Sequence, residues 1–181
     1  MVGKPYCFLH IPRTAGTTLN TVLKEWFRPE ETLTLYTEEE FAEQRELPVE
    51  RFESIRLIQG HIILQYYNPP RVYSQEVNVF TFLREPVARI ISEYSFLKTW
   101  EHSTMYAVIN DQDMSFAEYI TSDRKEVVFK GKNFMTRALS GEDTSTDRAR
   151  EKALSKAMQH LEKVFGFFGI QEMFDESLVM L

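Results

Sequence analysis

The sequence of 181 residues contains a single cysteine, Cys7, so no disulfide can form within the chain. A lone cysteine inside an apolar run is typical of a small buried hydrophobe, and a chain without disulfides fits a reducing compartment. No apolar run reaches the roughly 20 residues of a membrane-spanning helix, and the first residues lack a signal-peptide pattern. We therefore expect a soluble, cytoplasmic protein.

Positive charge is also scarce, because 21 Lys and Arg residues face 27 Asp and Glu residues and leave a formal net charge of -6. This balance argues against general binding to nucleic acid or to an anionic membrane, so any bound phosphate must be held by local cations. No cluster of residues has metal-ligand spacing, and we expect no metal. With no internal repeat and no low-complexity linker, residues 1–181 are predicted to form one domain.

Hydrophobic periodicity predicts strands that alternate with helices. The strands are expected at Tyr6–His10, Leu33–Tyr36, Arg56–His61, Val77–Leu83 and Phe165–Ile170. The helices are expected at Thr17–Phe27, Glu38–Arg45, Pro86–Trp100, Ser115–Thr121, Lys132–Leu139, Thr146–Val164 and Glu172–Met180. Apolar strands without clean alternation, separated by helices, indicate an α/β fold with a mainly parallel central sheet flanked by helices.

Two details of this pattern are specific enough to test. In the helix that begins at Pro86, the side chains of Val87, Ile90, Ile91 and Tyr94 are predicted to form an apolar stripe. Residues 99–114 have the weakest pattern and are predicted to be a solvated connector.

The segment "FLHIPRTAGTTL" joins the first strand to the first helix. Residues 12–17 form the junction, and a helix that starts there aims free backbone N–H groups at the turn, which favours binding of an anion such as phosphate. A Walker P-loop would have a lysine before Thr17 and a glycine at the start of the loop, and both are missing. An ordinary kinase or ATPase is therefore disfavoured.

A second segment, "VFTFLREPVARIISEY", places Arg84 at the end of a strand and Ser92 about two turns into the next helix. A guanidinium at a strand end and a hydroxyl on the following helix can both reach one phosphate, the guanidinium through two parallel N–H bonds. The segment therefore predicts a second phosphate contact.

In this order the two segments resemble the nucleotide-binding motifs of sulfotransferases that use 3′-phosphoadenosine 5′-phosphosulfate (PAPS), in particular the carbohydrate enzymes of the heparan sulfate type and their bacterial relatives. The resemblance implies a P-loop-like three-layer sandwich. It also implies that Arg84 and Ser92 bind the 3′-phosphate, and that a loop binds the 5′-phosphosulfate, formed by Arg13, Thr14, Ala15, Gly16, Thr17 and Thr18.

Weaker similarities extend over most of the chain. "IQGHIIL", which carries His61 between the two nucleotide motifs, resembles a segment of Golgi-type carbohydrate sulfotransferases and their bacterial relatives. "KNFMTRALSG" and "FGFFGIQEMFDESL" resemble later segments of the bacterial members. The sequence departs from the family in two places: Arg13 stands where lysine is usual, and the chain stops at Leu181, near the point where many relatives continue.

The expected reaction needs a cation for the leaving phosphate and a base for the acceptor hydroxyl. Arg13 is predicted to stabilise charge without donating a proton, because the pKa of arginine is above about 12. His61 is the predicted base, and His10 at the end of the first strand is its rival. Arg137 is a weaker candidate for contact with cofactor or acceptor, and a salt bridge would explain it almost as well.

The acceptor is expected to carry a hydroxyl and to be a carbohydrate. Aromatic loop residues such as Tyr66 and Tyr67 would suit a sugar, a lipid headgroup or a small phenol. Two alternatives stay open. One is a nucleotide-dependent phosphotransferase of the P-loop type. The other is a non-catalytic nucleotide-binding module, which Arg13 and the short C-terminus would suit.

Overall fold

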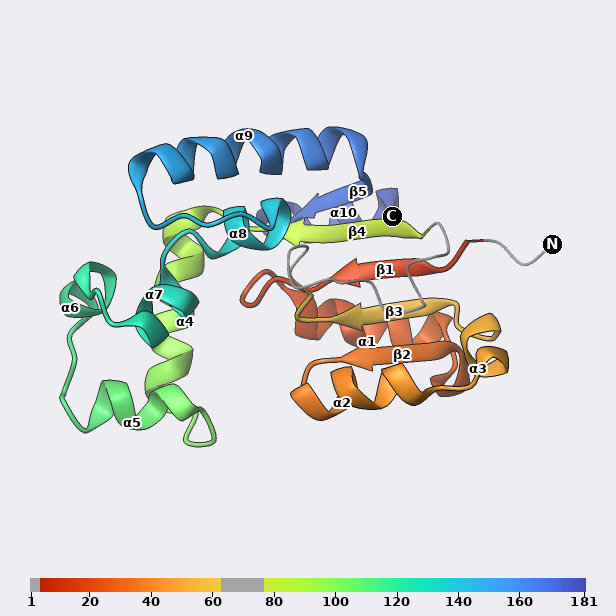
Figure 1. Cartoon of the computed structure of the whole chain (residues 1–181), viewed down its shortest axis with the longest axis horizontal. Helices are drawn as coiled ribbons and strands as arrows, with labels where there is room; N and C mark the ends of the chain where they lie inside the picture. The colour runs from red at the N-terminus through yellow and green to blue at the C-terminus, as the bar shows by residue number, and fades with distance from the viewer. Residues whose placement is uncertain (1–3, 63–76) are drawn as a thin grey trace. The chain divides into compact units, whose positions relative to one another are not determined.

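The computed structural model describes residues 4–62 and 77–181, and the chain divides into two compact units (Figure 1). The sheet unit comprises residues 1–83 and 135–181, and the helical unit comprises residues 84–134. Tyr66 and Tyr67 lie outside the described residues. Among the residues that are described, no helix is both long and apolar enough to cross a membrane.

The sheet unit is built on five parallel strands in the order β2-β3-β1-β4-β5. The strands are β1 (Tyr6–Leu9), β2 (Thr32–Leu35), β3 (Leu57–Gly60), β4 (Asn78–Leu83) and β5 (Phe165–Ile170). All five lie where the sequence predicts them. The predicted α/β fold with a parallel sheet flanked by helices is thereby confirmed.

The helices of this unit are α1 (Gly16–Trp26), α2 (Glu38–Glu43), α3 (Val49–Glu53), α8 (Phe134–Ser140, whose first residue ends the helical unit), α9 (Asp147–Lys163) and α10 (Phe174–Met180). Short 3-10 helices occupy Pro29–Glu31, Gln44–Glu46 and Gln171–Met173. Helix α9 packs on β5 at the edge of the sheet (Figure 1).

The core of the sheet unit lies between the sheet and two of its helices. Phe8, Phe80 and Phe82 from the strands meet Leu19 and Leu23 of α1, and α10 adds partly buried apolar side chains. The alternate strand residues on the opposite face, Cys7 among them, are also buried. A sheet covered on both faces explains why its strands read as continuous apolar runs.

The strand order reverses at β1, with β2 and β3 on one side and β4 and β5 on the other. In an open parallel sheet, the crevice beside the carboxyl ends of strands at such a reversal is where ligands bind. The "HIPRTAGTT" turn follows β1 at this point.

The helical unit contains α4 (Pro86–Thr99), α5 (Thr104–Asn110), α6 (Phe116–Thr121) and α7 (Lys125–Gly131). The predicted connector at residues 99–114 is wrong, because α5 lies within it. Ser103 caps this helix by accepting a hydrogen bond from the N–H of Met105, and the helix buries Met105 and Ile109 four residues apart.

The predicted apolar stripe on α4 is also wrong in part. Ile90 and Tyr94 pack against the core of the unit, but Val87 is 59% exposed and Ile91 is 46% exposed. The helix instead buries Arg89 and Glu93, which are 2% and 4% exposed and form an ion pair at 3.7 Å. A prediction from hydropathy alone assigns charged residues such as Arg89 and Glu93 to the solvent-exposed face, although here they are buried as an ion pair.

Candidate phosphate-binding site

The turn after β1 has a backbone suited to an anion. Arg13 and Ala15 adopt left-handed conformations, with φ of 69° and 68°. Such alternation turns successive N–H groups toward one concave side, which is a typical anion-binding arrangement. The hydroxyl of Thr14 donates to the carbonyl of Ile11 at 2.8 Å, and this buried side chain fixes the turn from within.

Helix α1 begins at Gly16 without a side-chain cap and without an acidic residue in its first turn. Its first N–H groups and the positive end of its dipole are directed into the turn. Thr17 and Thr18 are exposed, so their hydroxyls stand beside these N–H groups at the surface. Arg13, Gly16, Thr17 and Thr18 thus lie together in one short segment of the sheet unit.

Three ring side chains stand at the carboxyl ends of adjacent strands: His10 after β1, Tyr36 after β2 and His61 after β3. Backbone hydrogen bonds extend the strand pairing to the two histidines. The N–H of His10 donates to the carbonyl of Gly60 on β3 at 2.8 Å, and the N–H of His61 donates to the carbonyl of Leu35 on β2 at 3.1 Å. The ring centroid of His61 lies 4.9 Å from that of His10 and 4.9 Å from that of Tyr36.

The segment "TEEE", residues 37–40, follows β2 and holds Tyr36 in position. Thr37 and Glu40 form a capping box at the start of α2, and the Glu40 carboxylate also accepts the N–H of Tyr36 at 2.6 Å. The hydroxyl of Tyr36 meets Nδ1 of His10 at 3.1 Å and the Nδ2 of Asn20, on α1, at 2.7 Å. The ring cluster is thereby tied to α1, the helix that follows the candidate phosphate-binding turn.

His10 packs directly on Gly16. A Cβ at Gly16 would stand 1.8 Å from Nε2 of His10, so only glycine allows this approach. Burial, with the charge of nearby His61 as a second cause, lowers the pKa of His10 from 6.5 to about 3. His10 is therefore neutral at physiological pH, whereas His61 is exposed.

Arg84 and Ser92 belong to the helical unit. Arg84 directly follows β4 in the chain, Ser92 lies about two turns into α4, and both are half-buried. Glu85 caps α4, because its carboxylate accepts the N–H groups of Val87 at 2.9 Å and Ala88 at 2.6 Å. These two backbone hydrogen bonds are the main causes that lower the pKa of Glu85. The amino end of α4 is thus already occupied by an anionic side chain.

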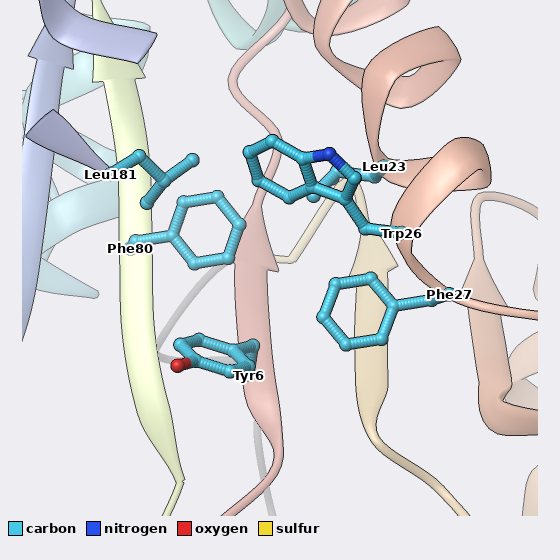
Figure 2. Close-up of a pocket in the computed structure, with 6 residues that line it drawn as sticks. All are labelled: Tyr6, Leu23, Trp26, Phe27, Phe80 and Leu181. Carbon is cyan, nitrogen blue, oxygen red and sulfur yellow. The ribbon is translucent and has the colours of Figure 1, made fainter. Parts of the chain in front are cut away.

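Two further features of the described residues bear on the site. They contain no group of three or more His, Cys, Asp or Glu side chains placed to hold a metal ion. A cavity of about 160 Å³ lies between α1 and the beginnings of β1 and β4, and apolar side chains dominate its lining (Figure 2). Those residues are Tyr6, Leu23, Trp26, Phe27, Phe80 and Leu181. Without a cation, this cavity is unsuited to phosphate.

Comparison with known families decides the assignment. The sequence model of the galactose-3-O-sulfotransferase family matches residues 4–181. The chain belongs to the galactose-3-O-sulfotransferase family. The predicted resemblance to carbohydrate sulfotransferases is thereby confirmed. No curated protein matches the chain.

In this sulfotransferase family member, the structure brings some of the predicted site residues together and leaves others apart. The loop residues, His10 and His61 all lie at the carboxyl edge of one sheet. Arg84 and Ser92 lie in the other unit, so their contact with the same nucleotide stays a prediction. Arg137 lies in α8, where its charge is a minor cause of the lowered pKa of Asp143, after the hydrogen bonds from Ser145 and Thr144.

Tyr36 and Asn20 are the residues of this site that the sequence analysis did not single out. The capping box at residues 37–40 was a usable signal for where β2 ends. The contact of Tyr36 with His10 is formed between residues 26 positions apart, and no local pattern predicts it.

Proposed function

We propose that the protein transfers a sulfuryl group from PAPS to a hydroxyl of a carbohydrate. The observation that carries the proposal is the uncapped start of α1, where a left-handed turn, Arg13 and the N–H groups of Gly16, Thr17 and Thr18 follow one another in one short segment. His10 packs on this segment at Gly16, and the ring of His61 lies 4.9 Å from that of His10. Its location at the reversal of a parallel sheet supports the same assignment.

The residues present fit a phosphosulfate group. The start of α1 offers N–H donors that have no partner within the helix and no side-chain cap, together with a positive dipole, and its first turn contains no acidic residue to compete with an anion. The contrast with α4 is informative, because there Glu85 already fills the equivalent position. We assign the 5′-phosphosulfate contact to Arg13, Thr14, Ala15, Gly16, Thr17 and Thr18, with Thr14 and Ala15 acting through the backbone.

When bound, PAPS would supply the sulfuryl group and a phosphate that leaves with growing negative charge. Arg13 and the N–H groups of the loop stabilise that charge electrostatically, as donors preorganised at a transition state do. Arginine stays protonated, so Arg13 acts as a fixed charge and not as an acid. Replacement of the usual lysine by arginine is compatible with this role.

His61 is proposed as the base that takes the proton of the acceptor hydroxyl. Its ring is exposed at the edge of the site, as contact with an acceptor requires, whereas His10 is buried and packed on Gly16. The family name makes the 3-hydroxyl of galactose the first acceptor to test. A galactoside with its 3-hydroxyl replaced by hydrogen is the matched control acceptor.

The donor is tested without knowledge of the acceptor by calorimetry with 3′-phosphoadenosine 5′-phosphate and with ADP. We expect the first ligand to bind much more tightly, because Arg84 and Ser92 are proposed to hold its 3′-phosphate. Arg84→Ala should weaken that binding by at least about tenfold, since a charge-assisted hydrogen bond contributes about 1.5–3 kcal/mol. ADP binding should hardly change.

Arg148→Ala, on an exposed position of α9, is the control substitution. Equal affinity of the unsubstituted protein for the two nucleotides would refute the assignment of Arg84 and Ser92. Tight nucleotide binding without turnover of any galactoside would favour a non-catalytic module. Phosphoryl transfer from ATP would favour a phosphotransferase.

A further inference from the structure

A chain of hydrogen bonds connects α1 to the ring cluster at the strand ends. The amide Nδ2 of Asn20 donates to the Tyr36 hydroxyl at 2.7 Å, and the same hydroxyl lies 3.1 Å from Nδ1 of His10. Asn20 is in the second turn of α1, one turn beyond Gly16. This series of hydrogen bonds therefore runs from α1, one turn after Gly16, to His10, which packs on Gly16.

The order of donors in this series of hydrogen bonds favours one position for the proton on His10. An amide nitrogen can only donate, so the oxygen of Tyr36 accepts from Asn20. The hydroxyl proton of Tyr36 is then free to point at Nδ1 of His10, and in that arrangement Nδ1 accepts it. A neutral imidazole that accepts at Nδ1 carries its own proton on Nε2, and Nε2 is the atom that lies against Gly16.

Tyr36 also contacts His61. Its ring meets the His61 ring nearly perpendicularly, at an interplanar angle of 88° and a centroid separation of 4.9 Å. The His10 ring completes the cluster, 5.6 Å from the Tyr36 ring and 4.9 Å from the His61 ring, and it stacks on Phe8 at 5.3 Å. Tyr36 therefore contacts both histidines, His10 through its hydroxyl and its ring and His61 through its ring.

We propose that Tyr36, held by Asn20, is a positioning residue for sulfuryl transfer, which fixes His10 in its Nε2-protonated neutral form against the phosphate-binding turn and supports the ring of His61. This inference rests on the proposed function, because it assigns His61 as the base. A neutral His10 matters because a second positive charge 4.9 Å from His61 would oppose the protonation that a base undergoes.

The state of His10 is tested directly by nitrogen-15 NMR of the histidine rings in the nucleotide-free protein. We expect His10 to show the Nε2-protonated form and no titration between about pH 5 and 8. Tyr36→Phe removes only the hydroxyl, and His10 should then show a mixture of the two neutral forms. Asn20→Ala, which frees the Tyr36 hydroxyl to reorient, should produce a smaller change in the same direction.

Turnover is tested with the same variants. Tyr36→Phe should lower kcat by about 10–100-fold, the scale expected for a displaced reacting group, with little change in the KM for the acceptor. Its affinity for 3′-phosphoadenosine 5′-phosphate should stay within about threefold, as for a residue that acts through the base. Tyr6→Phe, in the apolar cavity of the same unit, is the matched control and should keep normal kcat.

The readouts separate the two proposals. Loss of preference for the 3′-phosphate nucleotide would count against the proposed function, while the NMR measurement would still decide the state of His10. Protonation of His10 on Nδ1 in the unsubstituted protein overturns the inference. So does an unchanged kcat in both Tyr36→Phe and Asn20→Ala.

Discussion

Arg13 combines a left-handed backbone with the positive charge that the proposed mechanism needs. Its φ of 69° lies in the left-handed region, which costs a residue with a Cβ on the order of 1 kcal/mol or more. Ala15 repeats the same conformation two positions later. Strain of this kind persists where the surrounding structure holds it in place, and here the buried Thr14 hydroxyl anchors the turn at Ile11.

His61 provides the residue-scale test of the mechanism. His61→Ala should lower the transfer rate by about 10²–10⁴-fold and leave the affinity for 3′-phosphoadenosine 5′-phosphate nearly unchanged, since a general base acts on the acceptor. The rate of the unsubstituted protein should fall toward acid pH as the base is protonated. The variant should lose this acid-side fall.

The control for that experiment is His102→Ala, because His102 is exposed in the helical unit and has no proposed role. Normal turnover in His61→Ala, measured with an acceptor that the unsubstituted protein sulfates, would show that His61 is structural. The base would then have to be sought at another residue.

At this scale, the sequence predicted the parts of the site that are contiguous in the chain. The turn at residues 12–17 was visible because a strand, small hydroxyl residues and a helix follow one another. The contact of His10 with Gly16 was not predicted, because it depends on how a strand end folds back onto a helix. Tyr36 was missed because its partners, His10 and Asn20, lie far from it in sequence.

At the scale of elements, apolar runs located all five strands, and the errors fall among the helices. Short helices such as α5 and α7 present few turns over which a period can be read. Helix α4 was located correctly, but its buried face was misread, because hydropathy assigns Arg89 and Glu93 to solvent. Their burial depends on partners that only the folded unit supplies.

Arg89 has further partners besides Glu93 in the folded helical unit. The Nη2 of Arg89 donates to the carbonyls of Gly131 at 3.2 Å and Lys130 at 3.4 Å, which lie at the end of α7. The ring of Phe134 lies 5.6 Å from the guanidinium carbon. The negative end of a helix dipole and an aromatic face both favour a cation, so they offset part of the cost of burying Arg89.

Glu93→Leu is therefore expected to destabilise the helical unit by about 3–5 kcal/mol, because it leaves the Arg89 charge buried without its carboxylate. The double variant Arg89→Met with Glu93→Leu should recover a large part of that loss. Chemical denaturation measures both. Glu126→Ala is the control, since its ion pair with Arg124 is exposed and should contribute less than about 1 kcal/mol.

A double variant as unstable as Glu93→Leu alone would contradict this account. It would mean that the cost comes from lost packing around the two side chains and not from an uncompensated charge.

At the scale of the whole molecule, the phosphate-binding turn and the predicted 3′-phosphate residues lie in different units of an acidic chain. The sheet unit supplies Arg13 and His61, and the helical unit supplies Arg84 and Ser92. The single domain over residues 1–181, predicted from the chain length and from the absence of a repeat or linker, stays a prediction, and binding of one nucleotide by residues of both units would support it. Calorimetry on Arg84→Ala therefore tests the cooperation of the units as well as the role of one arginine.

The stability of the whole protein should depend on pH through His10. Its pKa is about 3 in the folded protein, against an ordinary value of 6.5. Between these values the unfolded chain binds a proton that the folded protein does not. The free energy of unfolding is therefore unaffected by the protonation of His10 above pH 6.5, and it decreases as the pH falls from 6.5 toward 3.

One proton corresponds to a slope of about 1.4 kcal/mol per pH unit, so denaturation midpoints should decrease from about pH 6.5 downward. His10→Asn should flatten this slope, whatever its effect on stability at neutral pH. Measurements above about pH 5 keep the contribution of His10 separate from that of Glu31 and Glu142. The pKa values of these two carboxyls are lowered in the folded protein, so they affect the pH dependence of stability only below the ordinary carboxyl range.

His102→Asn, in an exposed loop, should keep the slope of the unsubstituted protein. An equal slope in His10→Asn would show that His10 does not stay neutral in the folded protein, and that the contact with Tyr36 does not exclude a proton from Nδ1.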